Sequence, residues 1–486
     1  MKARNQKKCA LLTVAGLMAT LMAGCGAKDQ VKLDPDHPVS LTVWHYYNGA
    51  QQSTFDALVE EFNATVGQEK GIYVEEYSHG SVSELEEDVS SALAGEVGAE
   101  KLPDIFSSYA DTADNAQKEG KLADLTNYFS EDELSEYVDS YIQEGYFNDD
   151  GALYLLPVAK STEIMMINQT DWEPFAEATG ASLDELETMD GVVDVAERYY
   201  EWTDAQTPDI PDDGKAFYGR DSMSNYFLIG MRQMGTDLFE VKDGEVTLHT
   251  DKELIRRLWD SYYVPSVKGY FAAYGKFRSD DVKTGDILAY TGSTSSVFYF
   301  PDTVETDDGS HAIDFAVRNA PIMSGGENIR VQQGAGMAVT KSDEQHEYAA
   351  CVFLKWFTQK EQNLRFVCES GYLPVLKEAN DISAVEQVAE ENGIEMNAKT
   401  YTCLQTVMDS FSDTQFYTTK NFPNKYQARS VLDYHLSDKL SEDLAAINEA
   451  VANGSSREEA VAPYISDEAF EQWYESFCEA LQQSLE

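Results

Sequence analysis

The segment LYLLPVAKSTEIMMIN, residues 153–168, decides the predicted fold. It is long and extended in composition, and the polar run KSTE at 160–163 interrupts it. This composition is typical of a strand that passes from one lobe of a protein into another. A similar apolar stretch with small residues, QGAGMAV, follows at 333–339. Two such crossings predict two lobes, each assembled from segments that are distant in the sequence.

Strand and helix patterns alternate before the first crossing. Residues 39–43, 72–77 and 104–108 have strand composition. Polar residues 45–52 are expected to form a loop, and apolar residues spaced i, i+3, i+4, i+7 predict a helix capped by Ser53. The order strand, helix, strand, helix, strand predicts an open parallel sheet. Ligands bind such sheets beyond the carboxyl ends of the strands, which directs attention to 45–52 and 107–111.

The C-terminal third is predicted to be helical. One apolar helical face begins near Ser342, and the pattern continues to Gly371. Four cysteines lie downstream of residue 350, and their spacing shows no disulfide framework. Cys351 and Cys368 stand among apolar helical residues, which favours buried thiols that act as small hydrophobic side chains.

The charge of the chain limits its partners. The sequence holds 36 Lys and Arg against 86 Asp and Glu, a formal net charge of −50. Such a chain repels nucleic acid phosphates, so we expect no nucleic-acid binding, and we expect a soluble monomer. Aromatic residues make up 12% of the chain, so the acidity indicates a solvated surface rather than disorder.

The N-terminus has the pattern of an export signal. Four basic residues precede the apolar stretch 9–24, which is too short to span a bilayer comfortably and suits a signal peptide. The stretch ends in LMAGC at 21–25, which resembles the bacterial lipobox, although Met22 stands where Leu is preferred. We therefore expect residues 1–24 to be a lipoprotein signal peptide, Cys25 to carry the lipid, and residues 25–38 to be a tether. A secretory signal cut nearby is the alternative.

Sequence motifs of catalysis are missing. The sequence contains no GxxxxGK[ST] phosphate loop, no HExxH, no GxSxG and no CxxC. Among 86 carboxylates, any pair drawn for glycoside hydrolysis carries little information. We therefore expect no enzymatic activity, no cofactor and no metal site, with an exported glycan-acting enzyme as the rival hypothesis.

Four segments together resemble extracellular solute-binding proteins of the maltose-binding type, the receptors of sugar ABC importers. They are residues 41–63, 102–125, 153–168 and 333–375, in the order of that family. The resemblance implies an α/β, two-lobe periplasmic-binding-protein type II fold with hinge strands and a ligand cleft. It predicts a first lobe of residues 39–159 plus 337–378 and a second lobe of residues 160–336 plus 379–486.

The resemblance also implies site residues. In the first lobe they are the first cleft loop and the residues after the third strand; in the second lobe they are the crossover, a helix start and the GSTSS loop. The predicted ligand-binding residues are Tyr46, Tyr47, Asn48, Gln51, Ser108, Tyr109, Asp111, Ser161, Glu163, Asp221, Ser222, Gly292, Ser293 and Ser295.

Structural alternatives stand beside several of these predictions. Asp111, Asp221 and Ser222 are equally suited to cap helices, because Asp and Ser favour that position. Glu163 has the alternative of pairing with Lys160, and Trp44 suits core packing as well as cleft lining.

The predicted function follows from these features. A lipid-anchored receptor on the extracytoplasmic face of the cell membrane would capture a small polar solute and deliver it to the permease of an ABC importer. A mono- or oligosaccharide is the favoured solute, while polyols, phosphodiesters, polyamines and metals remain open. A surface adhesin or sensor that uses the same lobes is a second rival.

Overall fold

The computed structural model describes residues 31–148, 150–242, 244–306 and 309–486. The predicted signal peptide, Cys25 and the first part of the tether lie outside these residues. Within them, none of the helices combines the length and the apolar character that crossing a membrane requires.

The first lobe is built on a five-stranded sheet with the order β2-β1-β3-β14-β4. Strand β1 runs parallel to β2 and β3, while β14 is antiparallel to β3 and β4. The strands are β1 (Val39–His45), β2 (Ile72–Ser78), β3 (Ile105–Ser108), β4 (Leu156–Pro157) and β14 (Gly336–Val339). The sheet is thus mixed, and its parallel part is the one that the alternating pattern predicted.

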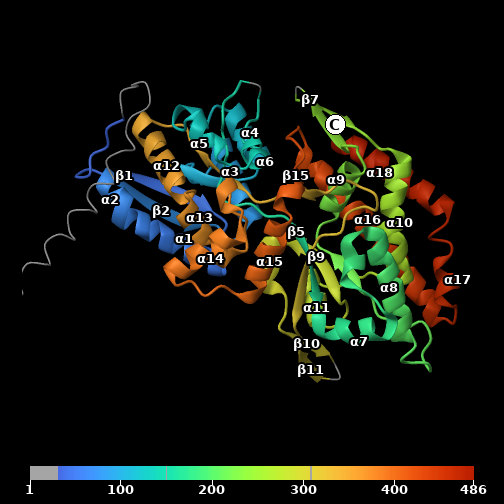
Figure 1. Ribbon diagram of the computed structural model, residues 1–486. Helices are drawn as coiled ribbons and strands as arrows, with labels where there is room; N and C mark the ends of the chain where they lie inside the picture. Colours follow the sequence, from blue (N-terminus) through green and yellow to red (C-terminus); the bar gives the residue numbers. More distant parts are fainter. Residues whose placement is uncertain (1–30, 149, 243, 307–308) are drawn as a thin grey trace, which may run out of the picture.

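Helices surround this sheet (Figure 1). They are α1 (Gly49–Phe62), α2 (Gln68–Lys70), α3 (Val82–Ala94), α4 (Ala110–Lys118), α5 (Glu131–Ser135), α6 (Asp139–Gln143), α12 (Glu344–Phe357) and α13 (Lys360–Ser370). The apolar stripe of α1 is buried, and each large side chain contributes about 1.5–3 kcal/mol when it leaves water. Ser81 caps α3.

The prediction that Ser53 caps α1 is wrong. The helix begins at Gly49, whose φ of +54° is a left-handed backbone conformation that favours glycine. Ser53 therefore lies inside the helix, where its hydroxyl donates to the Gly49 carbonyl. The expected loop at 45–52 shrinks to three residues between β1 and α1.

The second lobe is built on a four-stranded sheet with the order β12-β5-β9-β6. Its strands are β5 (Glu163–Asn168), β6 (Tyr218–Arg220), β9 (Ala289–Ser293) and β12 (Phe315–Asn319). Its helices are α7 (Gln169–Thr179), α8 (Met189–Asp204), α9 (Met223–Gln233), α10 (Lys252–Lys268), α11 (Arg278–Lys283), α16 (Lys425–Ala452), α17 (Arg457–Val461) and α18 (Asp467–Ser484). Small pairings complete it: β7 (Phe239–Lys242) with β8 (Glu245–Leu248), β10 (Thr303–Thr306) with β11 (Gly309–Ala312), and β13 (Ile329–Val331) with β15 (Gln415–Tyr417).

The structure confirms that the quoted segment crosses between the two sheets. β4 belongs to the first sheet and β5 to the second, so residues 158–162 connect them. The second crossing, residues 332–335, lies beside the first, and Ser161 and Gln333 exchange two backbone hydrogen bonds of 2.9 Å. The buried Lys160 side chain ties the pair together, donating to Glu144 at 2.5 Å and to the Gly334 carbonyl at 2.7 Å.

Residues 379–413 contact both lobes. Helix α14 (Ile382–Asn392) packs on α13, and α15 (Ala398–Asp409) packs on β12. The side chains of β5 alternate between two hydrophobic clusters. Ile164 and Met166 belong to the cluster that contains the first-lobe core, residues of α15 and part of the second sheet. Met165 and Ile167 join the separate core of the second lobe. The predicted lobe boundaries at residues 159, 336 and 378 stay predictions.

Gly334 offers a test of the crossing. Its φ is +93°, and a Cβ there would lie 2.8 Å from the Ala159 carbonyl oxygen. Gly334→Ala should lower the free energy of unfolding by at least about 1 kcal/mol more than the matched control Gly235→Ala. Gly235 has φ +87° with nothing within 4 Å of its Cβ position, so it carries the backbone cost alone. Equal losses in urea unfolding would contradict the close packing of the two crossings.

Candidate functional site

Three tyrosines gather on the side of the first lobe that faces the second. Tyr46 follows β1, Tyr109 precedes α4 and Tyr372 follows α13. The hydroxyls of Tyr46 and Tyr372 lie 3.3 Å apart. Burial raises the pKa of Tyr109, the neighbouring Tyr46 raises it further, and Arg429 of the second lobe works in the opposite direction. The Tyr109 hydroxyl is therefore within electrostatic reach of Arg429 in the second lobe.

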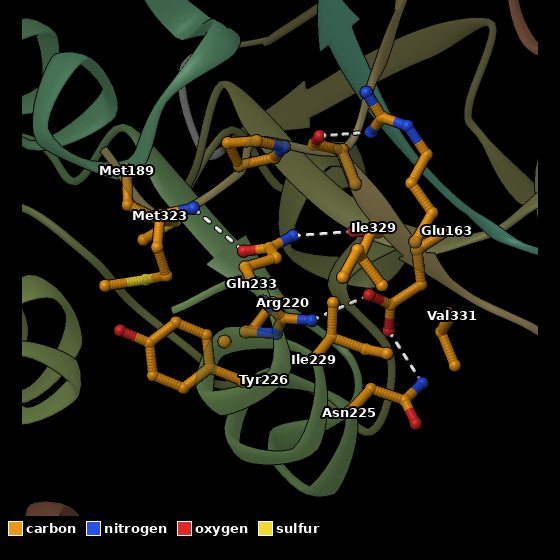
Figure 2. Close-up of a pocket in the computed structure, with 14 residues that line it drawn as sticks. Glu163, Met189, Arg220, Asn225, Tyr226, Ile229, Gln233, Met323, Ile329 and Val331 are labelled. Carbon is orange, nitrogen blue, oxygen red and sulfur yellow. Dashed lines mark hydrogen bonds and ion pairs between the residues drawn. The ribbon is translucent and has the colours of Figure 1, made fainter. Parts of the chain in front are cut away.

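A polar network on the second lobe surrounds the Glu163 carboxylate (Figure 2). Arg220 donates to it at 2.8 Å and the Asn225 amide donates to it at 2.9 Å. All three side chains are buried. Burial acts to lower the pKa of Arg220, but the Glu163 carboxylate and three neighbouring tyrosines together outweigh it, and the pKa is raised. Both oxygens of Glu163 are thus engaged, and the carboxylate orders its neighbours.

Helix α16 extends this network. Arg429 donates to the Ser224 hydroxyl at 2.7 Å and to the Asn225 side-chain oxygen at 3.2 Å. One turn earlier, burial lowers the pKa of Lys425, while Asp111 and Glu144 of the first lobe raise it. The N-terminal turns of α16 therefore bring Lys425 within electrostatic reach of acidic groups of the first lobe.

Direct contacts also join the lobes beside this region. The Asn421 amide donates to the Asp114 carboxylate at 2.5 Å, and Lys118 pairs with the same carboxylate at 2.8 Å. Burial raises the pKa of Tyr372, and a side-chain hydrogen bond with Ser295 of the second lobe works in the opposite direction. Gly371 is so close to the second lobe that a Cβ would lie 2.8 Å from the Thr294 carbonyl oxygen.

The predicted residues of the first lobe divide into two groups. Tyr46, Tyr109 and Asp111 lie in the region between the lobes described above. Tyr47 instead packs in the core, with its ring 5.0 Å from that of Phe366. The other three bond within the lobe: Asn48 and Gln51 donate to backbone carbonyls of residues 80 and 370, and the buried Ser108 donates to that of Tyr109.

The predicted residues of the second lobe also fall into two groups, those near the other lobe and those engaged within the crossing or the second lobe. Glu163 and Ser295 lie near the other lobe, whereas Ser161 is buried in the crossing. Asp221 accepts from the Arg278 backbone amide at 2.9 Å, and its other oxygen lies 2.6 Å from the Cβ position of Gly292. The Ser293 hydroxyl caps the short 3-10 helix of residues 294–299 and lies 2.9 Å from that of Ser295.

The structural alternatives are decided as follows. Tyr109, not Asp111, occupies the cap position of α4, and Asp111 lies in the first turn. Ser222 caps α9 as the alternative predicted. The proposed Lys160–Glu163 pair is wrong, because each side chain has another buried partner. Trp44 belongs to the core.

Sequence analysis missed Arg220, Tyr372, Lys425 and Arg429. Their partners lie up to 326 residues away in the sequence, so no local motif marks them. One signal was present: Lys425 and Arg429 stand at i and i+4 in a C-terminal third that is otherwise acidic.

The described residues contain one cluster with metal-ligand composition, formed by His45, Asp56 and Glu76. The Tyr47 backbone amide donates to Nδ1 of His45, so Nε2 carries the proton that bonds to Glu76 at 2.9 Å. Burial lowers the pKa of His45 to about 4, so the ring is neutral at pH 7. A neutral ring with a protonated Nε2 has no free lone pair for a metal there.

The cysteines agree with the sequence analysis. Cys351, Cys368 and Cys403 are buried free thiols, and Cys478 is half-buried. Burial raises the pKa of Cys368 to about 12, so this thiol stays protonated and inert.

Comparison with known families decides the identity. Residues 57–395 match the model of the bacterial extracellular solute-binding protein family. The chain belongs to this family. Its family is one of binding proteins, and the family description implies a place outside the cytoplasm. A search of curated proteins found no match.

Solved structures of other binding proteins share this fold. The cyclic α-maltosyl-1,6-maltose binding protein of Arthrobacter globiformis is 21% identical, with a TM-score of 0.61, over 92% of this chain and 100% of that one. An ABC substrate-binding protein of Listeria monocytogenes in complex with cycloalternan is 16% identical, with a TM-score of 0.63, over 92% and 99%. UgpB from Mycobacterium tuberculosis in complex with glycerophosphocholine is 16% identical, with a TM-score of 0.61, over 92% and 100%. These likenesses confirm the predicted two-lobe periplasmic-binding-protein fold.

The carboxyl group of Glu86 on α3 is expected to make the stability of the binding protein depend on pH. Burial and the adjacent Asp111 carboxylate raise the pKa of Glu86 from 4.5 to about 7. A raised carboxyl pKa stabilises the fold below pH 4.5, and this contribution is lost as the pH rises through 7. Glu86→Gln should therefore raise the melting temperature at pH 8 by a few degrees and leave it nearly unchanged at pH 4.5. The matched control Glu87→Gln, at an exposed neighbouring position, should show no such difference. A change in melting temperature of equal size at both pH values in the Glu86→Gln variant would contradict this prediction.

Proposed function

We propose that this binding protein is the lipid-anchored receptor of an ABC importer and that it captures a mono- or oligosaccharide between its lobes. The observation that supports this most is the pairing of surfaces across the lobes. Tyrosine rings stand on one side, and an ordered network of carboxylate, amide and guanidinium groups stands on the other. Sugars present apolar C–H faces and hydroxyls that both donate and accept, so they match such a pair.

The charges between the lobes support a neutral solute. Acidic groups at Glu86, Asp111 and Glu144 oppose basic groups at Lys160, Lys425 and Arg429. Neither sign is in clear excess, although the protein as a whole carries −50. An anionic phosphodiester or a polyamine would be recognised better by a surplus of one sign.

Capture would proceed by closure of the lobes about the two crossings. A solute held on one lobe favours the closed form only through the additional contacts that it makes with the other lobe. Moving an equilibrium from 1:99 to 99:1 requires roughly 5.5 kcal/mol of such differential binding. The closed monomer would then dock on a membrane permease without performing chemistry on the solute.

A thermal-shift screen tests the solute class. Mono- and oligosaccharides should raise the melting temperature, because a ligand that binds only the folded state stabilises it. Glycerophosphocholine and polyamines belong in the same screen. Stabilisation by these alone would contradict the proposal, as would turnover of an oligosaccharide by the purified protein.

Arg429 tests the place of binding. Arg429→Gln should weaken the affinity for the identified sugar at least 10-fold, because the guanidinium orders the Asn225 amide between the lobes. The control Lys439→Gln lies on the same helix and pairs with Asp443 four residues later. It should leave calorimetric affinity unchanged. An Arg429→Gln variant that binds normally would place the solute elsewhere.

The anchor needs a separate experiment in cells. Cys25→Ser should release the exported protein from the membrane fraction, because the thiol that would carry the lipid is missing. Fractionation followed by immunoblotting measures this. A Cys25→Ser variant that stays in the membrane fraction as fully as the natural protein would contradict lipid anchoring.

A further inference from the structure

A large hollow lies wholly within the second lobe. Its volume is about 1490 Å³, larger than the roughly 300–1,000 Å³ of sites that hold drug-sized ligands. Its walls are the end of β6, the loop 272–278 and one face of α16. Nothing in the proposed mechanism of closure uses this space.

The hollow begins beside the region between the lobes. Asp221 and Ser222 line it, and they directly follow Arg220, which belongs to the network around Glu163. From there it follows α16 from Asp433 to Asn448, a length of about 22 Å at 1.5 Å per residue. Arg220 itself lines the hollow, so it belongs both to this wall and to the network around Glu163.

Three exposed aromatic side chains line this hollow. Tyr274 is 71% exposed, Phe277 52% and Tyr434 62%. Aromatic side chains of this size are usually largely buried, and within the described residues these three rings stack on no other aromatic ring. The Lys276 ammonium lies over one face of Phe277, 5.2 Å from the ring centroid. The exposed ring surface that remains suits packing against the C–H face of a sugar.

The loop that carries two of these rings is held in place. The buried Asp281 carboxylate accepts from the backbone amides of Tyr274 at 3.2 Å and Gly275 at 2.6 Å. It also pairs with Arg278, whose own backbone amide donates to Asp221. A loop that is ordered before a ligand arrives loses little entropy on binding.

The remaining lining is polar and mixed in charge. Hydroxyl and amide groups from Ser437, Ser441 and Asn448 alternate with apolar residues along α16. Basic and acidic side chains balance one another; they include Lys215, Lys276, Arg457, Asp286, Glu305 and Asp433. A neutral polyhydroxylated chain suits this lining better than a charged one.

We propose that the hollow binds the outer units of a chain-like oligosaccharide whose first units lie between the lobes. This inference rests on the proposed function, because it assumes a carbohydrate in the primary site. It goes beyond that function by assigning a preference for longer chains to the loop 272–278 and α16.

Calorimetry with chains of different length tests the inference. The probes are linear gluco- and manno-oligosaccharides of two to seven units, titrated into the full-length protein. Affinity of the natural protein should rise with chain length for one of the two series. The double variant Tyr274→Ala/Phe277→Ala and the single variant Tyr434→Ala should lose at least 10-fold in affinity for the longest chain. Their affinity for the shortest chain that binds should change less than 2-fold.

Tyr73→Ala is the matched control, since Tyr73 is a 47% exposed tyrosine on β2 of the first lobe. It should bind every chain as the natural protein does. Affinity that is independent of chain length, or variants that lose short and long chains equally, would overturn the assignment of the hollow while the proposed function stands. If no carbohydrate binds the natural protein, both the proposed function and the assignment of the hollow fail.

Hydrogen exchange supplies a second measurement that needs no variant. A seven-unit chain should slow amide exchange in residues 272–278 and 433–448 of the natural protein, and a two-unit chain should not. Equal protection by both chains, or none by the longer one when it binds, would overturn the inference even if the variants fail to fold.

Discussion

The paired backbone crossings are the constraint on which the rest of the structure depends. Ser161 and Gln333 hold the two segments together with reciprocal hydrogen bonds, and residues 379–413 contact both lobes beside them. The ammonium group of Lys160 is removed from water and compensated by Glu144 and a backbone carbonyl. Removing one member of a buried ion pair leaves an uncompensated charge, which costs several kcal/mol. The connection therefore has a defined geometry about which two rigid lobes can turn.

The crossings also explain where the site lies. The chain enters the second sheet at Glu163, so this carboxylate stands at the boundary between the lobes. From there it orders Arg220 and Asn225, and through Asn225 it reaches Arg429 on α16. Each of these groups would be costly to bury alone, but the network satisfies them together. The result is an ordered polar network at the boundary between the lobes. Tyrosines of the first lobe lie near the same boundary.

The sequence predicted the fold well and the site only in part. The crossing segment and the apolar stripes depend on local patterns, so β4, β5 and the burial of α1 followed from residue order. The site depends on contacts between distant segments. Tyr47 was indistinguishable from Tyr46 in the sequence, yet the Tyr47 ring packs against Phe366, whereas the Tyr46 hydroxyl lies 3.3 Å from that of Tyr372. No local motif marked Arg429, because its partners at residues 224 and 225 belong to a different helix.

Closure about the crossings is the central claim, and pulsed electron–electron double resonance measures it most directly. Spin labels at Ser83 on α3 and Glu442 on α16 would report the separation of the lobes at two exposed positions. Saturation with the sugar identified by thermal shift should move the distance distribution to shorter values and narrow it. A distribution unchanged by saturating sugar, in a protein that binds the sugar by calorimetry, would contradict capture by closure.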